Sequence, residues 1–241
     1  MLAAAPFVGS FLGTVIRRLP EGGSVVSGRS RCEQCGTNLS IRDLLPLVSW
    51  AATKGRCRRC GARLGWFYPA VEIASIAIAG LSIAVDAGAA VWIDALLGWW
   101  LLALGWIDLR RWLLPDVLTL PLIVVGIAEA GWLAPSELTD RAVGAVCGYL
   151  VLRLVAWVYR MMRGRDGLGQ GDAKLLAAAG AWVGASGLPS VLAGAACSAL
   201  VGAGVLVLCG TRLSRYSALP FGPFLALATW LVWLLGPLLL I

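Results

Sequence analysis

Residues 89–107 read AAVWIDALLGWWLLALGWI and carry a single charged side chain, Asp94. A helix needs about 20 apolar residues to cross the hydrocarbon core of a bilayer. A proline-free run of this length therefore predicts one transmembrane helix, which ends directly before Asp108.

Seven more apolar runs flank this stretch. They cover residues 1–16, 68–85, 117–133, 142–162, 173–185, 188–209 and 221–241. The chain of 241 residues is 59% hydrophobic and only 14% charged, whereas soluble domains are about a quarter charged. This composition excludes an ordinary soluble enzyme, a disordered chain and a disulfide-rich secreted domain. We predict an all-α polytopic membrane protein with about eight transmembrane helices, of which the first is short.

The basic residues predict how these helices are oriented. If the chain begins outside, the inner loops are about residues 17–67, 108–116, 160–174 and 210–219, and they hold 18 of the 20 Lys and Arg residues. Positive charge marks the cytoplasmic loops of membrane proteins. Topology thus accounts for the net charge of +7, and we do not expect nucleic acid as a partner.

Two Cys-x-x-Cys pairs lie in the first inner loop. Cys32 and Cys35 are separated by 21 residues from Cys57 and Cys60, and a glycine follows each pair. This spacing is typical of one tetrahedral zinc held by four thiolates, a structural site with no open position for water. Two disulfides are the alternative, but disulfides are rare in the reducing cytoplasm. We expect the remaining cysteines to be packing residues in apolar runs; they are Cys147, Cys197 and Cys209.

These features divide the chain into three parts. We expect a short first membrane helix over residues 1–19, a cytoplasmic zinc-binding segment over residues 20–67, and a membrane-embedded core of about seven helices over residues 68–241. The chain has no histidine, which excludes Ser-His-Asp and Cys-His catalysis. Carboxylates are therefore the leading acid–base candidates in the core.

Two carboxylates are predicted to meet at the inner membrane face. Asp108 closes one span, and Asp172 opens another within the GxGD sequence 169–172. Two facing carboxyls that share a proton can activate water and protonate a carbonyl, as in aspartic proteases. Gly169 and Gly171 would let the backbone, or an extended substrate, approach Asp172 closely. Alternatively, Asp172 is only an N-terminal helix residue that the helix dipole favours, and Asp108 pairs with Arg110 or Arg111 at the membrane interface.

The order of these motifs resembles that of the type IV prepilin peptidases, a family of GxGD intramembrane aspartic proteases. The similar segments are Gly9–Pro20, Gly28–Cys32 with the two cysteine pairs, Pro46–Trp50, Gly55–Cys57, Tyr68–Glu72, Asp108–Asp116, Gly169–Lys174 and Pro220–Phe224. The resemblance covers nearly the whole chain. It implies that Asp108 and Asp172 are the catalytic pair. Asp116 is the rival for the role of Asp108, and its alternative is to cap the following span.

Other charged residues receive supporting or structural roles. Glu72 lies where the family has a glutamate. Its role is expected to be recognition of the substrate amine, methyl transfer or polar packing. Lys174 is expected to reach the membrane interface rather than act in the chemistry. Asp94 and Glu129 have no motif context, and we expect them to pair within the bundle.

The resemblance also implies the reaction. The family hydrolyses a short basic leader from prepilins and pseudopilins after a glycine, at the cytoplasmic face of the bacterial inner membrane. Many members then N-methylate the new N-terminus with S-adenosylmethionine, and the four motif cysteines favour this bifunctional type. The implied cofactors and partners are structural zinc, S-adenosylmethionine, a prepilin or pseudopilin, and membrane lipids. The alternatives are a zinc-stabilised scaffold, an ion- or proton-coupled transporter, and a methyltransferase or adaptor with an inactive protease site.

Overall fold

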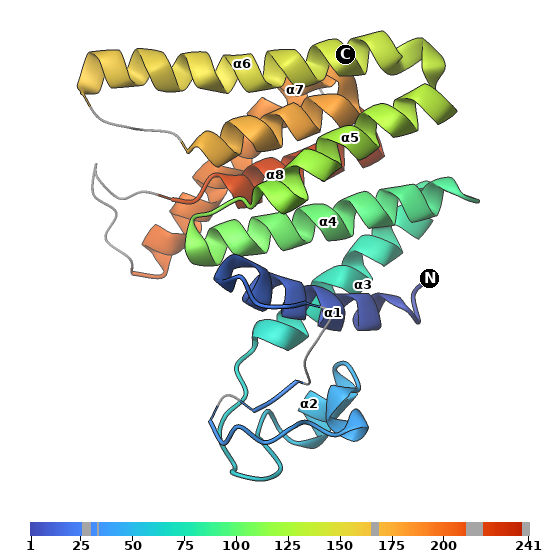
Figure 1. The fold of residues 1–241 in the computed structure, drawn as a ribbon, viewed down its shortest axis with the longest axis vertical. Helices are drawn as coiled ribbons and strands as arrows, with labels where there is room; N and C mark the ends of the chain where they lie inside the picture. The colour runs from blue at the N-terminus through green and yellow to red at the C-terminus, as the bar shows by residue number, and fades with distance from the viewer. Residues whose placement is uncertain (26–29, 33, 165–168, 211–218, 238–241) are drawn as a thin grey trace. The chain divides into compact units, whose positions relative to one another are not determined.

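The described part of the chain is helical, as predicted. The computed structural model describes residues 1–25, 30–32, 34–164, 169–210 and 219–237. Within these ranges the only β-structure is two isolated bridges, Arg31 with Asn38 and Arg56 with Arg63 (Figure 1). The chain forms two compact units, Met1–Trp99 and Trp100–Ile241, and their boundary lies within the helix α4 (Ala90–Arg111).

The first unit contains α1 (Ala5–Arg18), α3 (Phe67–Val85) and the first half of α4. Between α1 and α3 lie the short helices η1 (Leu19–Glu21), η2 (Ile41–Leu44) and α2 (Val48–Ala52). The crossing of α1 and α3 is tight, since a Cβ on Gly9 would lie 2.6 Å from the Cα of Glu72. The Trp99 indole donates a hydrogen bond to the Ser75 carbonyl over 3.0 Å and ties α4 to α3.

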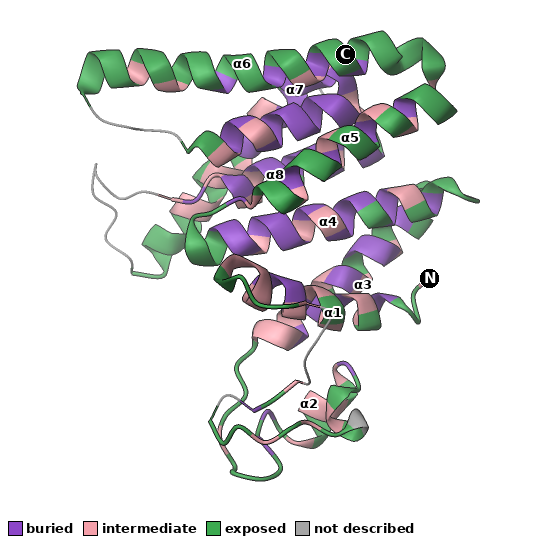
Figure 2. Cartoon of the chain, viewed as in Figure 1, coloured by how far each residue is buried: buried purple, intermediate pink, exposed green. Residues whose placement is uncertain are grey.

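The second unit is built around α7 (Gln170–Leu208). The other elements are the rest of α4, α5 (Asp116–Leu133), η3 (Pro135–Glu137), α6 (Leu138–Arg163) and α8 (Gly222–Leu235). The first half of α7 is almost wholly buried (Figure 2). The Trp182 indole donates to the Leu122 carbonyl of α5 over 3.0 Å and meets the Trp233 ring of α8 edge-on at 5.2 Å. One side chain thereby connects three helices.

Glycines set the contact between α6 and α7. A Cβ on Gly148 would lie 2.5 Å from the Leu176 carbonyl oxygen, so only glycine lets the two backbones come this close. The predicted runs 173–185 and 188–209 are joined in α7 across a kink, where Gly184 has φ 75° and ψ 174°. Only glycine adopts this conformation readily.

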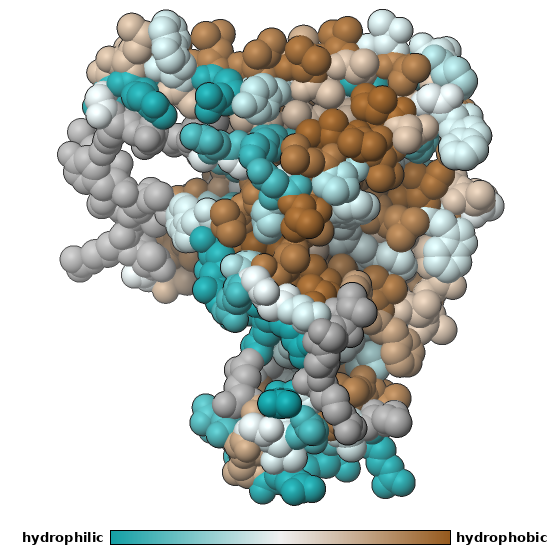
Figure 3. Space-filling view, viewed as in Figure 1, coloured by the Kyte–Doolittle hydropathy of each residue, from teal (hydrophilic) through white to brown (hydrophobic). Residues whose placement is uncertain are grey.

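Five of the described helices are long and apolar enough to cross a membrane: α3, α4, α5, α6 with η3, and α7. Figure 3 shows hydrophobic surface over the helices and hydrophilic surface over the cysteine segment. The chain is therefore a multi-pass membrane protein. Two of the eight predicted spans are the halves of α7, and two more form α1 and α8, with 14 described residues each. Hence the total of eight remains a prediction.

For side chains within the helices, the structure confirms the prediction for Glu129 and contradicts the one for the non-motif cysteines. Glu129 forms an ion pair with Arg141, as expected of a carboxylate within the bundle. Arg141 is buried, pairs also with Glu137 at 2.8 Å, and lies over the Trp233 ring at 5.0 Å. The expectation for the three non-motif cysteines is wrong, because all of them are exposed rather than packed within the chain: Cys147 lies on α6, Cys197 on α7, and Cys209 directly after α7.

Candidate active site

Asp108 and Asp172 come from different helices and meet in the second unit. Asp108 lies in the last turn of α4 and is 7% exposed, and Asp172 lies in the first turn of α7 and is 9% exposed. The two carboxyls are close enough for the charge of Asp108 to act on Asp172. Asp172 also accepts a hydrogen bond from the backbone of Gly169. Two buried carboxyl groups thus share one small region of the unit.

The chain after α4 explains how the two aspartates approach each other. Trp112 has φ 55°, and its amide donates to the Asp108 carbonyl over 2.8 Å, which ends the helix. Leu114 then packs against α7. A Cβ on Gly171 would lie 2.9 Å from the Cβ of Leu114. The lack of a side chain at Gly171 therefore makes room for Leu114. This contact brings the start of α7 against the segment that follows Asp108.

Gly222 belongs to this site, although the sequence did not single it out. Its amide donates to Oδ2 of Asp108 over 3.0 Å from the first residue of α8. A Cβ on Gly222 would lie 2.6 Å from the same oxygen. The only signal in the sequence is that Gly222 lies inside the motif Pro220–Phe224. With Gly222, the N-termini of α7 and α8 both lie beside the carboxyls, and helix N-termini favour negative charge.

Asp116 and Lys174 form a separate pair in the same unit. The Lys174 amine lies 2.6 Å from Oδ1 of Asp116, and the Asp116 side chain is 56% exposed. The N-cap of α5 is Pro115, and Asp116 is the first helical residue, so the alternative of Asp116 as the N-cap is wrong. Asp108 is buried beside another carboxyl, whereas Asp116 is exposed beside a cation. The two candidates for the first catalytic role therefore have very different surroundings.

The four motif cysteines lie together in the first unit. Their sulfurs are all within 4.8 Å of one another, and the sulfurs of Cys32 and Cys60 are 3.9 Å apart. Tetrahedral zinc with Zn–S bonds of about 2.3 Å separates its sulfurs by about 3.8 Å, so this cluster could hold a metal ion. The cysteines are free, and the alternative of two disulfides is not what the structure shows.

The two cysteine pairs form the same kind of turn. The amide of Cys32 donates to Thr37 and that of Gly36 to Cys32, and the second pair repeats both bonds with Cys57, Gly61 and Ala62. Gly36 and Gly61 have φ 66° and 70°, which explains the glycine after each pair. Hydrogen bonds from the Thr37 side chain and backbone lower the pKa of the Cys35 thiol to about 6. Burial and the neighbouring thiols raise the pKa of Cys60 to about 11, so the proton is lost first at Cys35.

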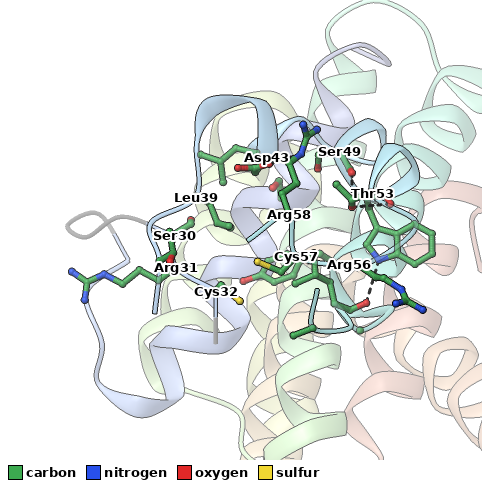
Figure 4. Close-up of a pocket in the computed structure, with 18 of the residues that line it drawn as sticks. Ser30, Arg31, Cys32, Leu39, Asp43, Ser49, Thr53, Arg56, Cys57 and Arg58 are labelled. Carbon is green, nitrogen blue, oxygen red and sulfur yellow. Dashed lines mark hydrogen bonds and ion pairs between the residues drawn. The ribbon is translucent and has the colours of Figure 1, made fainter. Parts of the chain in front are cut away.

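A cavity of about 690 Å³ lies beside the cysteines (Figure 4). Its walls come from α1, α3 and the cysteine segment, and include Cys32, Cys57, Trp50, Tyr68 and Glu72. Several arginines line it, but Figure 4 shows the Arg31 and Arg56 guanidinium groups pointing away on opposite sides. Arg58 turns to Asp43 at 3.0 Å. The interior is thus less basic than the number of lining arginines suggests.

Glu72 is the buried carboxylate of this cavity. It is 4% exposed, and its Oε2 accepts a hydrogen bond from the Leu47 amide over 2.8 Å. Leu47 has φ 58° and ψ −47°, a conformation that costs energy for a branched residue and persists only where its surroundings hold it. Glu72 therefore holds the segment Pro46–Trp50 against α3.

Comparison with known proteins gives a consistent result. Residues 4–85 match the family model described as the bacterial peptidase A24 N-terminal domain, and residues 95–207 match the one described as the type IV leader peptidase family. The chain is 36% identical to the prepilin leader peptidase/N-methyltransferase of Aeromonas salmonicida (strain A449), over 95% of this chain and 87% of that protein. Proteins of the same name from Pseudomonas aeruginosa and Burkholderia pseudomallei (strain 1026b) are 37% and 39% identical, over 95% and 86% of this chain and 87% and 67% of theirs. No solved structure matches the chain.

Proposed function

Because the chain belongs to the type IV leader peptidase family, we propose that it is a membrane-embedded aspartic endopeptidase that removes the leader from prepilins or pseudopilins. The observation that carries this proposal is the buried pair Asp108 and Asp172, held by the start of α7 and the Gly222 amide. We propose cleavage after a glycine, followed by N-methylation of the new N-terminus.

The proposed chemistry needs one carboxyl in each protonation state. The ionised carboxylate accepts a proton from water, while the protonated partner donates to the carbonyl oxygen of the scissile bond. The Gly222 amide holds Oδ2 of Asp108 and so fixes the orientation of that carboxyl. A helical substrate must unwind locally before this pair can reach its backbone, because the amide groups of an intact helix are already bonded.

The test is a cleavage assay with full-length protein in detergent and a prepilin that has a Gly-Phe junction. Asp108→Asn or Asp172→Asn should each slow leader loss by roughly a hundredfold to ten-thousandfold, the range for one general acid or base. Asp116→Asn is the matched control and should stay within about threefold of wild type, because Asp116 is exposed and paired with Lys174. Mass spectrometry follows the loss of the leader.

The outcomes separate the candidates. Cleavage that survives Asp108→Asn but not Asp116→Asn would transfer the first role to Asp116. Absence of cleavage by folded wild type on several pilins would favour a zinc-stabilised scaffold or an ion- or proton-coupled transporter. A product heavier by one methylene without the need for Asp108 or Asp172 would indicate a methyltransferase that acts on substrate cleaved elsewhere.

We propose that the cysteine cluster holds structural zinc and that the neighbouring cavity takes S-adenosylmethionine. Cavities of roughly 300–1,000 Å³ suit such ligands, and Trp50 and Tyr68 offer aromatic surface for a nucleoside. S-adenosylmethionine supplies an electrophilic methyl group when it is bound. Glu72 would hold the substrate's ammonium and accept its proton. In the cleavage assay Glu72→Gln should therefore remove the methylated product and leave leader loss in place.

We propose that the protein lies in the bacterial inner membrane with its active site and cysteine segment at the cytoplasmic face. The excess of Lys and Arg in the loops that contain these residues supports this orientation. A prepilin with a cytoplasmic leader and an apolar stem in the bilayer would then present its cleavage site at the depth of Asp108 and Asp172. Anionic lipid headgroups would attract the basic cysteine segment, and nothing in this arrangement calls for nucleic acid.

A further inference from the structure

Arg153 is a charged side chain in the middle of an otherwise uncharged part of α6. Residues 142–159 contain no other charged residue, and 18 residues of helix span about 27 Å, close to the roughly 30 Å of a hydrocarbon core. Arg153 lies about 10 Å along the helix from Arg160 and about 18 Å from Arg141. It is therefore deep within the span whichever way α6 is oriented.

The side chain lies on the face of α6 that the rest of the second unit leaves uncovered, as far as the structure describes its residues. Gly144 and Gly148 are buried against α7, while Leu150, Arg153 and Trp157 are exposed. Figure 2 shows most of α6 as exposed. We name the exposed side the Arg153 face, which comprises Val146, Leu150, Arg153, Leu154 and Trp157. In a membrane this face meets either lipid or another helix.

Few contacts within the second unit stabilise the charge of Arg153. Its guanidinium carbon lies 6.0 Å from the centre of the Tyr149 ring, at the outer limit of a cation–π contact, and none of the described carboxylates forms an ion pair with it. Helical side chains lean toward the N-terminus, which directs Arg153 away from the nearer end of the span at Arg160. An arginine so placed is costly in lipid, and intramembrane charges usually have a charged partner.

We propose that the Arg153 face docks a transmembrane helix of another protein that carries a carboxylate at the depth of Arg153. Charge complementarity selects this partner, because a guanidinium binds a carboxylate through two parallel hydrogen bonds. The surrounding apolar side chains would pack against the rest of that helix. This inference does not depend on the proposed peptidase activity.

A second copy of the chain does not meet this requirement. Among the described residues, the carboxylates well inside spans are already buried or paired: Glu72 and Asp94 are buried, and Glu129 pairs with Arg141. Exposed carboxylates such as Asp116 and Glu137 lie at the ends of helices. A like copy would therefore bring no free carboxylate to mid-membrane depth.

The test uses full-length protein in lipid vesicles with a labelled Leu-Ala helix of about 22 residues that carries one central Glu. A second probe with Gln at that position is otherwise identical. Energy transfer between protein and probe measures association. We expect the Glu probe to bind wild type about tenfold more tightly than the Gln probe, and Arg153→Leu to abolish this difference. Arg160→Leu is the matched control on the same helix and should preserve it.

Other results would overturn the proposal. Equal binding of the two probes to wild type, or an unchanged preference in Arg153→Leu, would show that Arg153 recognises no carboxylate. Self-association of labelled protein that disappears in Arg153→Leu would assign the face to a second copy instead. Because Arg153→Leu only replaces a lipid-exposed charge with an apolar group, it should remain folded, and thermal unfolding of the variant verifies this.

Discussion

At the scale of single residues, the site depends on backbone amides as much as on carboxyls. The sequence singles out Asp108 and Asp172 because an ionisable side chain in an apolar run is costly and needs a reason. It does not single out Gly222, since what this residue provides is an amide and the absence of a side chain. Neither property marks this glycine in the sequence, because every residue except proline has a backbone amide and every glycine lacks a side chain. Carboxyls can thus be predicted from sequence, while their hydrogen-bond donors require the fold.

Gly222→Ala tests this contribution. The new Cβ would lie 2.6 Å from Oδ2 of Asp108, so the carboxyl or the start of α8 must move. A displacement of about 1 Å can cost roughly a hundredfold in rate, and we expect a loss of this size in kcat for leader cleavage. Gly131→Ala on α5 is the control, because nothing lies within 4 Å of a Cβ there. Cleavage by Gly222→Ala at the wild-type rate would mean that the amide does not orient Asp108.

At the scale of elements, α7 shows what the apolar pattern can and cannot predict. The sequence has two apolar runs with Gly184–Pro189 between them, which predicts two spans and a very tight turn. In the structure two helices meet at Gly184, whose backbone is not helical, and the second returns along α8, with Gly187 beside Val232 and Gly202 beside Phe224. Hydropathy shows where apolar residues begin and end. It does not show the direction of the backbone, which depends on φ and ψ of a single glycine.

Gly184→Ala should therefore destabilise the protein. Gly184 has φ 75° and ψ 174°, a region that costs about 1–3 kcal/mol for a residue with a side chain. Gly204→Ala on the same helix is the matched control, since Gly204 has open space around it, and there alanine should be neutral or stabilising by up to about 1 kcal/mol. Reversible unfolding in mixed micelles measures both. Equal stability of the two variants would argue against the kinked conformation.

At the scale of the whole molecule, two kinds of site occupy two compact units. The cysteine cluster and Glu72 lie in Met1–Trp99, and the aspartate pair lies in Trp100–Ile241. The sequence predicted both groups because each has a spacing or setting with a chemical reason. It could not predict that the first half of α4 belongs to one unit and the second half to the other, since the apolar run 89–107 is continuous.

This division predicts a local response to loss of the metal. If the cluster holds zinc as proposed, Cys57→Ser or treatment with a chelator should loosen the segment around residues 30–65, because the metal of such a site joins the loops that carry its ligands. We expect amide hydrogen exchange there to rise at least about tenfold, while peptides from α7 around Asp172 keep their protection. Cys147→Ser is the control, since Cys147 is exposed on α6 and outside the cluster. Loss of protection in α7 as well would mean that the units fold as one, and that the metal supports the aspartate pair in addition to its own segment.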